Sequence, residues 1–138
     1  MNSLPPLMTY GLMLSILIIS MIGFLFFFLI LEYSHYPYRE KRQGQFYRWL
    51  SCGFFHANWL HLALNLFVLY QFGSTIEFIY KSQFGFYFGG LLFLSVYLII
   101  LVIGCIPTYF HYSNNVNYSS IGASGAISGI LFIYVLYY

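Results

Sequence analysis

Three long stretches without a charged side chain set the strongest limit on what this chain can fold into. Met1–Leu31, Trp49–Ile76 and Ser82–Tyr138 contain no Asp, Glu, Lys or Arg. Each stretch exceeds the roughly 18 apolar residues that indicate a bilayer-spanning helix. Backbone groups inside lipid need internal hydrogen bonds, which helices provide. The sequence therefore predicts an all-α, polytopic transmembrane helix bundle that is an integral, multi-pass membrane protein.

The charge content agrees with this prediction and excludes other classes. Only 6% of the 138 residues are charged, whereas about a quarter are charged in a soluble domain. The net charge of +2 comes without a basic stripe, so we expect no nucleic-acid partner. The two cysteines, Cys52 and Cys105, do not indicate a disulfide scaffold and are expected to behave as small apolar side chains.

We treat residues 1–138 as one membrane domain with four expected spans, at residues 10–31, 55–80, 84–106 and 121–138. The last span corresponds to about 27 Å of helix, which barely crosses a bilayer. Residues 32–54 form a long first loop that holds four of the five basic residues. Within it, Tyr47–Leu50 indicates a segment at the membrane interface. Pro107–Ser120 is expected to be a second loop because it is rich in Asn and Ser.

The second span carries polar residues on one helix face. His61 and Asn65 are four positions apart and project from the same side, one turn from each other. Imidazole and carboxamide groups are costly in lipid unless they pair or face a cavity, so they indicate a functional site. The alternative is that they are satisfied packing residues. His56 and His61 lie about 140° apart around a helix, and no carboxylate stands in zinc-type register, so we expect no metal site.

Glu77, near the end of the second span, needs a cationic partner. We expect this partner to be Arg48, from the first loop, rather than Lys81, which lies beyond the expected helix end.

The last span begins with Gly122-Ala123-Ser124-Gly125. Glycines on both sides of Ser124 allow a substrate or another backbone to approach its hydroxyl closely. A helix N-terminus at this point would also favour developing negative charge. The alternative is a close-packing patch, because Gly125 and Gly129 form a GxxxG pattern. The tetrapeptide by itself leaves both interpretations open.

Together, the second span and this tetrapeptide resemble the rhomboid family of intramembrane serine proteases. The family pattern is a His, a second His five residues later, an Asn four residues after that, and a distant GxSG. His56, His61, Asn65 and Ser124 match it position by position. The resemblance extends from about Gln45 to the end of the chain.

The resemblance implies that the Ser124 hydroxyl attacks a peptide carbonyl of a transmembrane substrate. It also implies that the side chains of His61 and Asn65, with the backbone N–H of Ser124, hold the oxyanion. Supporting roles fall to His56, Gly122, Gly125, Arg48 and Glu77. The expected partners are transmembrane protein substrates and membrane lipid, with no cofactor and no metal.

One departure from the family concerns the general base. Rhomboids pair the serine with a histidine on the last of six core helices, whereas this sequence ends inside the fourth. We therefore expect a fragment with four of the six helices, no general-base histidine and no activity by itself. One alternative is an inactive rhomboid-like protein that binds membrane clients. Another is a transporter-like bundle in which His61, Asn65 and Glu77 line a polar path.

Overall fold

The computed structural model describes residues 5–138, which form a helical bundle without a β-strand. The α-helices are α1 (Leu7–Leu25), α2 (Phe27–Tyr33), α3 (Pro37–Gln43), α4 (Arg48–Ser51), α5 (Trp59–Val68), α6 (Ser74–Phe84), α7 (Phe86–Tyr112) and α8 (Ser124–Tyr137). A 3₁₀ turn, Cys52–Phe54, follows α4, and a π-helical turn, Leu69–Gly73, joins α5 to α6. The predicted all-α helix bundle is confirmed.

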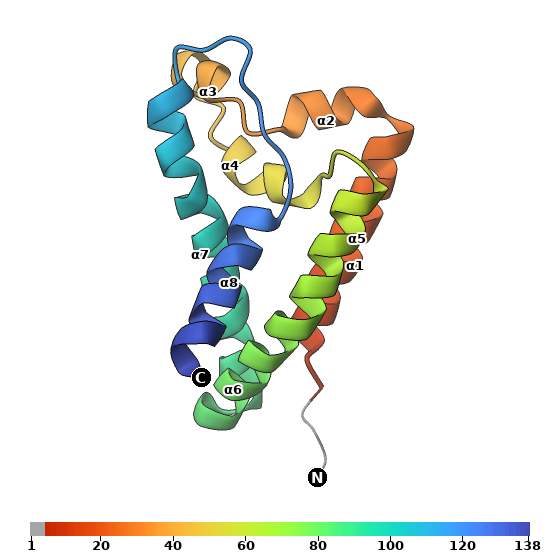
Figure 1. The fold of residues 1–138 in the computed structure, drawn as a ribbon, viewed down its shortest axis with the longest axis vertical. Coiled ribbons are helices and arrows are strands. Elements are labelled where there is room, and N and C mark those ends of the chain that lie inside the picture. Colours follow the sequence, from red (N-terminus) through yellow and green to blue (C-terminus); the bar gives the residue numbers. More distant parts are fainter. Residues whose placement is uncertain (1–4) are drawn as a thin grey trace.

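The long helices stand roughly along the vertical axis of Figure 1. α1 runs beside α5 and the π-helical turn, while α8 packs on α7. α2, α3 and α4 gather at the upper end, where α3 and α4 contact α7. The first loop is therefore a packed layer of short helices. It lies at the end of the bundle where α8 begins.

Among residues 5–138, three helices are long and apolar enough to cross a membrane: Leu7–Leu25, Trp59–Phe84 and Phe86–Tyr112. The fourth predicted span forms the shorter apolar helix α8, of 14 residues, which is about 21 Å long. The chain thus has the helices of a membrane protein.

The first predicted span, residues 10–31, is not one helix. α1 begins earlier, at Leu7, and ends at Leu25, and Phe26 then leaves the helical region with φ −124° and ψ 76°. The break leads into α2, which turns across the upper end of the bundle (Figure 1). No glycine or proline marks position 26, so nothing in the sequence signals the break.

The second helix begins and ends at recognisable signals. Asn58 has extended backbone angles, and its side-chain oxygen accepts the N–H of His61 at 2.9 Å, as an N-cap residue does. The helix therefore starts at Trp59 instead of Phe55. It continues past Tyr80 to Phe84 and stops at Gly85, which has a positive φ of 88°.

The predicted loop Pro107–Ser120 is wrong for its first half. α7 continues through Pro107 to Tyr112. A proline removes one backbone hydrogen bond, and transmembrane helices tolerate this where neighbouring groups compensate. The observed loop is residues 113–123.

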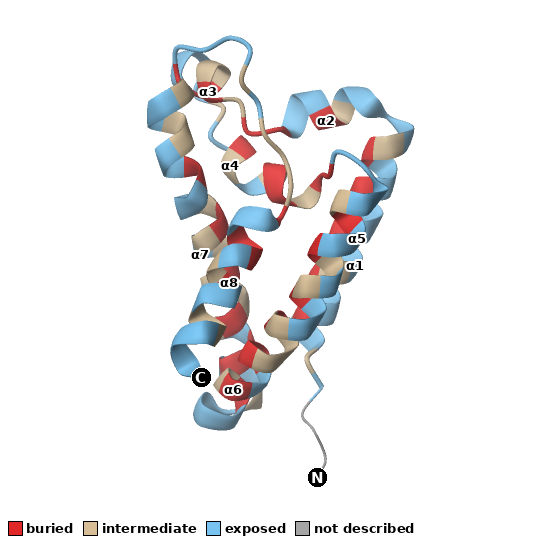
Figure 2. Cartoon of the chain, viewed as in Figure 1, coloured by how far each residue is buried: buried red, intermediate tan, exposed pale blue. Residues whose placement is uncertain are grey.

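Buried residues lie on the sides of the helices that face one another, and exposed residues lie on their outer sides (Figure 2). Gly129 is part of this packing, because a Cβ at this position would clash with the side chain of Ile100 on α7. A Cβ at Gly125 would meet nothing within 4 Å. Of the two glycines in the GxxxG pattern, Gly129 serves helix packing and Gly125 does not.

Glu77 does not pair with Arg48, so that expectation is wrong. Its Oε1 lies 2.6 Å from Lys81 Nζ, one turn further along α6. The carboxylate also accepts the N–H groups of Met8 and Thr9, at 3.0 and 2.7 Å, and the Thr9 hydroxyl at 2.8 Å. Glu77 therefore caps the first turn of α1, where free N–H groups favour an anion.

This arrangement predicts a large effect of Glu77→Gln on stability. Both members of the Glu77–Lys81 pair are buried, so neutralising one leaves an uncompensated charge in the core. The free energy of unfolding in detergent should fall by about 3–5 kcal/mol. Glu32→Gln is the control, since the Glu32 carboxylate is about half exposed. Equal losses in the two variants would contradict the capping role.

Candidate functional site

The Gly122–Gly125 loop is held in place by residues from the first half of the chain. Gly122 N–H donates to the carbonyl of Cys52 at 2.9 Å, and Ala123 N–H donates to His56 Nε2 at 3.3 Å. Ser124 is the first residue of α8, and its side chain is exposed. The nucleophile candidate thus stands at a helix N-terminus, with the loop before it fixed by two N–H donors.

Gly122 allows His61 to approach this loop. A Cβ on Gly122 would lie 2.6 Å from Cε1 and 2.9 Å from Nε2 of the His61 ring. The φ of Gly122 is 118°, a conformation that other residues rarely adopt. The imidazole on α5 therefore lies directly against the backbone that leads to Ser124.

His56 links this loop to α1. Because Ala123 N–H donates to Nε2, the ring proton is on Nδ1, which donates to the Ser20 hydroxyl at 2.9 Å. Ser20 in turn donates to the carbonyl of Phe54, also at 2.9 Å. Burial, with a smaller effect from His61, lowers the pKa of His56 to about 4. The ring is therefore neutral at pH 7 and acts as a structural tether.

Asn65 provides an amide donor without a partner. Its side chain is 7% exposed, and Nδ2 has no hydrogen-bond partner among the described residues. It lies one turn after His61 on α5. A buried, unsatisfied N–H is uncommon and calls for an explanation, such as a group that binds there during function.

Ser124 also faces a cavity of about 160 Å³, which it lines with Gly122 and Gly125. The opposite walls come from the first loop and α7, and His61 and Asn65 are not among the lining residues. The remaining lining residues are His35, Cys52, Leu101, Gly104, Cys105, Thr108, Ser120 and Ile121. The His61 ring thus lies against the serine loop at Gly122. It does not line the cavity that Ser124 and Gly125 border.

Arg48 organises the first loop. Its guanidinium is fully buried and donates to the carbonyls of Leu31 and Ser34, at 3.2 and 3.1 Å. Nε donates to Gln45 at 2.8 Å. Arg48 therefore fastens the end of α2 to α4, and it makes these contacts without Glu77.

Within residues 5–138, no side-chain hydrogen bond joins Ser124 to a histidine. His35 bonds to Glu40 and Thr108 instead, and His111 stacks edge-on against Tyr112 at the end of α7. The same residues hold no group of three His, Cys, Asp or Glu side chains suited to a metal ion. Among the described residues, Ser124 therefore has an exposed side chain at a helix start and no histidine bonded to it.

Sequence reasoning missed the buried pair formed by His35 and Glu40. Both lie in the predicted first loop, residues 32–54, yet they are 2% and 0% exposed. One signal was available, because Pro37 followed by an acidic residue in the first turn is typical of a helix start.

Two comparisons with known proteins bear on this site. The family model described as Rhomboid domain matches residues 43–138. Rhomboid-like protein 11, chloroplastic, from Arabidopsis thaliana is 39% identical over 90 residues. That alignment covers 65% of this chain and 29% of the relative, so the chain spans less than a third of the relative's length.

The close approach of His61 predicts opposite effects at the two glycines that flank Ala123-Ser124. Gly122→Ala should lower the free energy of unfolding by about 2–4 kcal/mol, because the positive φ and the clash with the imidazole both act against the new Cβ. Gly125→Ala is the matched control and should be neutral or stabilising, because its Cβ has open space in a helix. Denaturant titration in mixed micelles measures both, and a neutral Gly122→Ala would contradict the described contact.

Proposed function

The chain belongs to the rhomboid family, and on that premise we propose that it carries the nucleophile and the oxyanion-binding residues of an intramembrane serine endopeptidase. The substrates are transmembrane proteins, and no cofactor takes part. The contact between His61 and Gly122 carries this proposal. This contact joins the motif that contains His61 to the Gly122–Gly125 motif, far apart in the sequence. A serine hydrolase needs its nucleophile and its oxyanion donors at one place.

Ser124 is the proposed nucleophile. Its exposed hydroxyl stands at the start of α8, where the first N–H groups of a helix have no intrahelical acceptor. The partial positive charge at this end favours an oxyanion, and the backbone N–H of Ser124 is one proposed donor to it.

His61 and Asn65 are the proposed side-chain donors to the oxyanion. The unpartnered Nδ2 of Asn65 supports this role, because a free buried donor gains a hydrogen bond when the tetrahedral intermediate forms. Such donors are worth about 3–4 kcal/mol each in a site of low dielectric. His56 supports them by tethering the loop, and Gly122 supports them by admitting the His61 ring.

A serine hydroxyl is a weak nucleophile without a base. His35 and His56 are engaged in hydrogen bonds with other residues. We therefore assign the base to a histidine outside residues 1–138, as the family resemblance implies. In the lipid bilayer, α8 is proposed as a fourth span beside the three longer helices, and substrate and lipid are its neighbours.

The lack of a histidine bonded to Ser124 within the described residues also favours a second candidate function. In this alternative the protein is an inactive rhomboid-like protein that binds transmembrane clients without cleaving them. Labelling of the serine distinguishes the two functions.

A fluorophosphonate probe tests the proposed nucleophile. The full-length natural protein, in membranes, should form a covalent adduct at Ser124 that mass spectrometry locates, and Ser124→Ala should abolish it. Ser128→Ala is the control, since Ser128 is an exposed hydroxyl one turn further along α8. No adduct, with membrane clients still bound, would favour the inactive alternative.

Asn65→Ala tests the oxyanion role. The rate of probe labelling should fall by about 10²-fold, the size found when one oxyanion donor is removed. Gln71→Ala, an exposed amide on the same continuous helix, should leave the rate unchanged. A thermal unfolding midpoint close to that of the wild type separates loss of a donor from loss of the fold. Unchanged labelling in Asn65→Ala would remove this residue from the site.

A further inference from the structure

A buried polar pair lies in the first loop, apart from the residues assigned above. His35 Nδ1 and Glu40 Oε1 are 2.8 Å apart, and both side chains are almost completely buried. Burying such a pair costs free energy, and apolar side chains of similar size often stabilise a core as well or better. The pair therefore needs a role beyond stability, and its partners indicate one.

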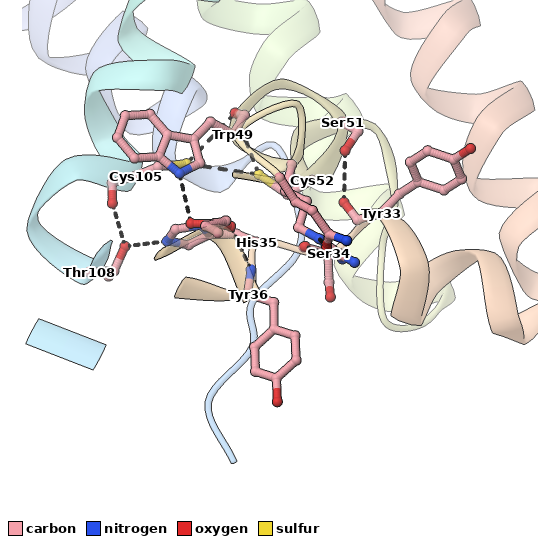
Figure 3. Close-up of polar contacts among 12 residues, drawn as sticks. Tyr33, Ser34, His35, Tyr36, Trp49, Ser51, Cys52, Cys105 and Thr108 are labelled. Atoms are coloured by element: carbon pink, nitrogen blue, oxygen red, sulfur yellow. Dashed lines mark hydrogen bonds and ion pairs between the residues drawn. The ribbon is translucent and has the colours of Figure 1, made fainter. Parts of the chain in front are cut away.

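The Glu40 carboxylate is fixed by three donors. Oε1 accepts His35 Nδ1–H and the backbone N–H of Tyr36 at 2.7 Å, and Oε2 accepts Trp49 Nε1–H at 2.7 Å (Figure 3). Two of these donors come from the residues just before α3, and the third comes from α4. The carboxylate can therefore hold the imidazole in one orientation.

The other ring nitrogen reaches α7. His35 Nε2 lies 2.7 Å from the Thr108 hydroxyl, which itself donates to the carbonyl of Cys105 at 2.9 Å (Figure 3). The ring is therefore hydrogen-bonded at both nitrogens and spans the gap between the first loop and α7.

The backbone of His35 is bonded to the segment that leads to Ser124. His35 N–H donates to the carbonyl of Ser120 at 2.9 Å, and Ser120 N–H donates to the carbonyl of His35 at 3.0 Å. Ser120 lies four residues before Ser124, and His35, Ser120 and Ser124 line the same cavity. A movement of His35 is therefore passed to the serine loop through two hydrogen bonds.

We propose that His35 and Glu40 are positioning residues for Ser124. The pair sets the place of Ser120, and with it the entry of the chain into α8. This inference rests on the proposed function for its catalytic consequence only, because the mechanical link is visible in the hydrogen bonds themselves. His35 acts through the loop and does not contact the reacting atoms.

Two substitutions weaken the link while keeping side-chain size. Glu40→Gln replaces the carboxylate at the centre of the three donors with an amide, and Thr108→Val removes the hydroxyl that is bonded to His35 Nε2. Thr108→Ser keeps the hydroxyl and should restore wild-type behaviour. Matched controls are Lys41→Gln, at an exposed contact with Asn114, and Thr75→Val, at an exposed hydroxyl that bonds within its own helix.

Hydrogen–deuterium exchange measured by mass spectrometry reports the position of the loop. Exchange at Gly122 and Ala123 should speed up by about tenfold in Glu40→Gln and Thr108→Val, the effect of losing one hydrogen bond of ordinary strength. α1 and α5 should exchange as in the wild type. Fluorophosphonate labelling of Ser124 should slow by about tenfold in the same two variants, with Thr108→Ser and both controls unchanged.

The outcomes separate this inference from the proposed function. Faster exchange throughout α1, α5 and α7 would show a purely structural role and overturn the inference, as would loop exchange equal to that of the wild type. Slower labelling without faster loop exchange would also overturn it. If the wild-type protein is not labelled at all, the proposed function fails. In that case, faster exchange confined to the serine loop still supports the link from Glu40 through His35 to Ser120.

Discussion

Backbone hydrogen bonding in apolar surroundings is the constraint on which the rest of this structure depends. Helices satisfy it within themselves, but the segment that leads into α8 is not helical and needs partners from elsewhere. Gly122 finds one in the carbonyl of Cys52, and Ala123 finds one in the neutral ring of His56. A neutral ring suits this task, because its bare nitrogen accepts a hydrogen bond. The need to satisfy backbone hydrogen bonds in apolar surroundings therefore accounts for the helices and also for the contacts that hold the loop before Ser124.

Much of this architecture could be predicted because its signals are local. Uncharged runs long enough to cross a bilayer become the long helices. The four-residue spacing of His61 and Asn65 places both on α5, and the last helix does begin within the Gly122–Gly125 motif, at Ser124. Even the start of α5 at Asn58 follows a known capping preference, although the predicted boundary lay four residues too early.

The rest could not be predicted because it depends on partners that are distant in the sequence. More than one cation could have paired with the Glu77 carboxylate. In the structure Glu77 lies against the first turn of α1, and its cationic partner there is Lys81. No local pattern marks His35 and Glu40 as a buried pair, because the side chains that hold them are Thr108 on α7 and Trp49 on α4. The break at Phe26 has no marker residue at all. Contacts between residues far apart in the sequence therefore decided between local structures and pairings that the sequence alone did not distinguish.

The placement of charge links these observations to chemistry. Glu77 and Lys81 lie at one end of the bundle, and Glu40 and Arg48 lie in the first loop at the other (Figure 1). Each of these charges has its own partners, so none is left free to act at Ser124. The serine loop itself is contacted by the rings of His56 and His61, and it ends in the N–H groups of a helix start. Such groups need little reorganisation as an oxyanion forms, and a low dielectric strengthens them. Donors of this kind are what the proposed peptidase chemistry needs at Ser124.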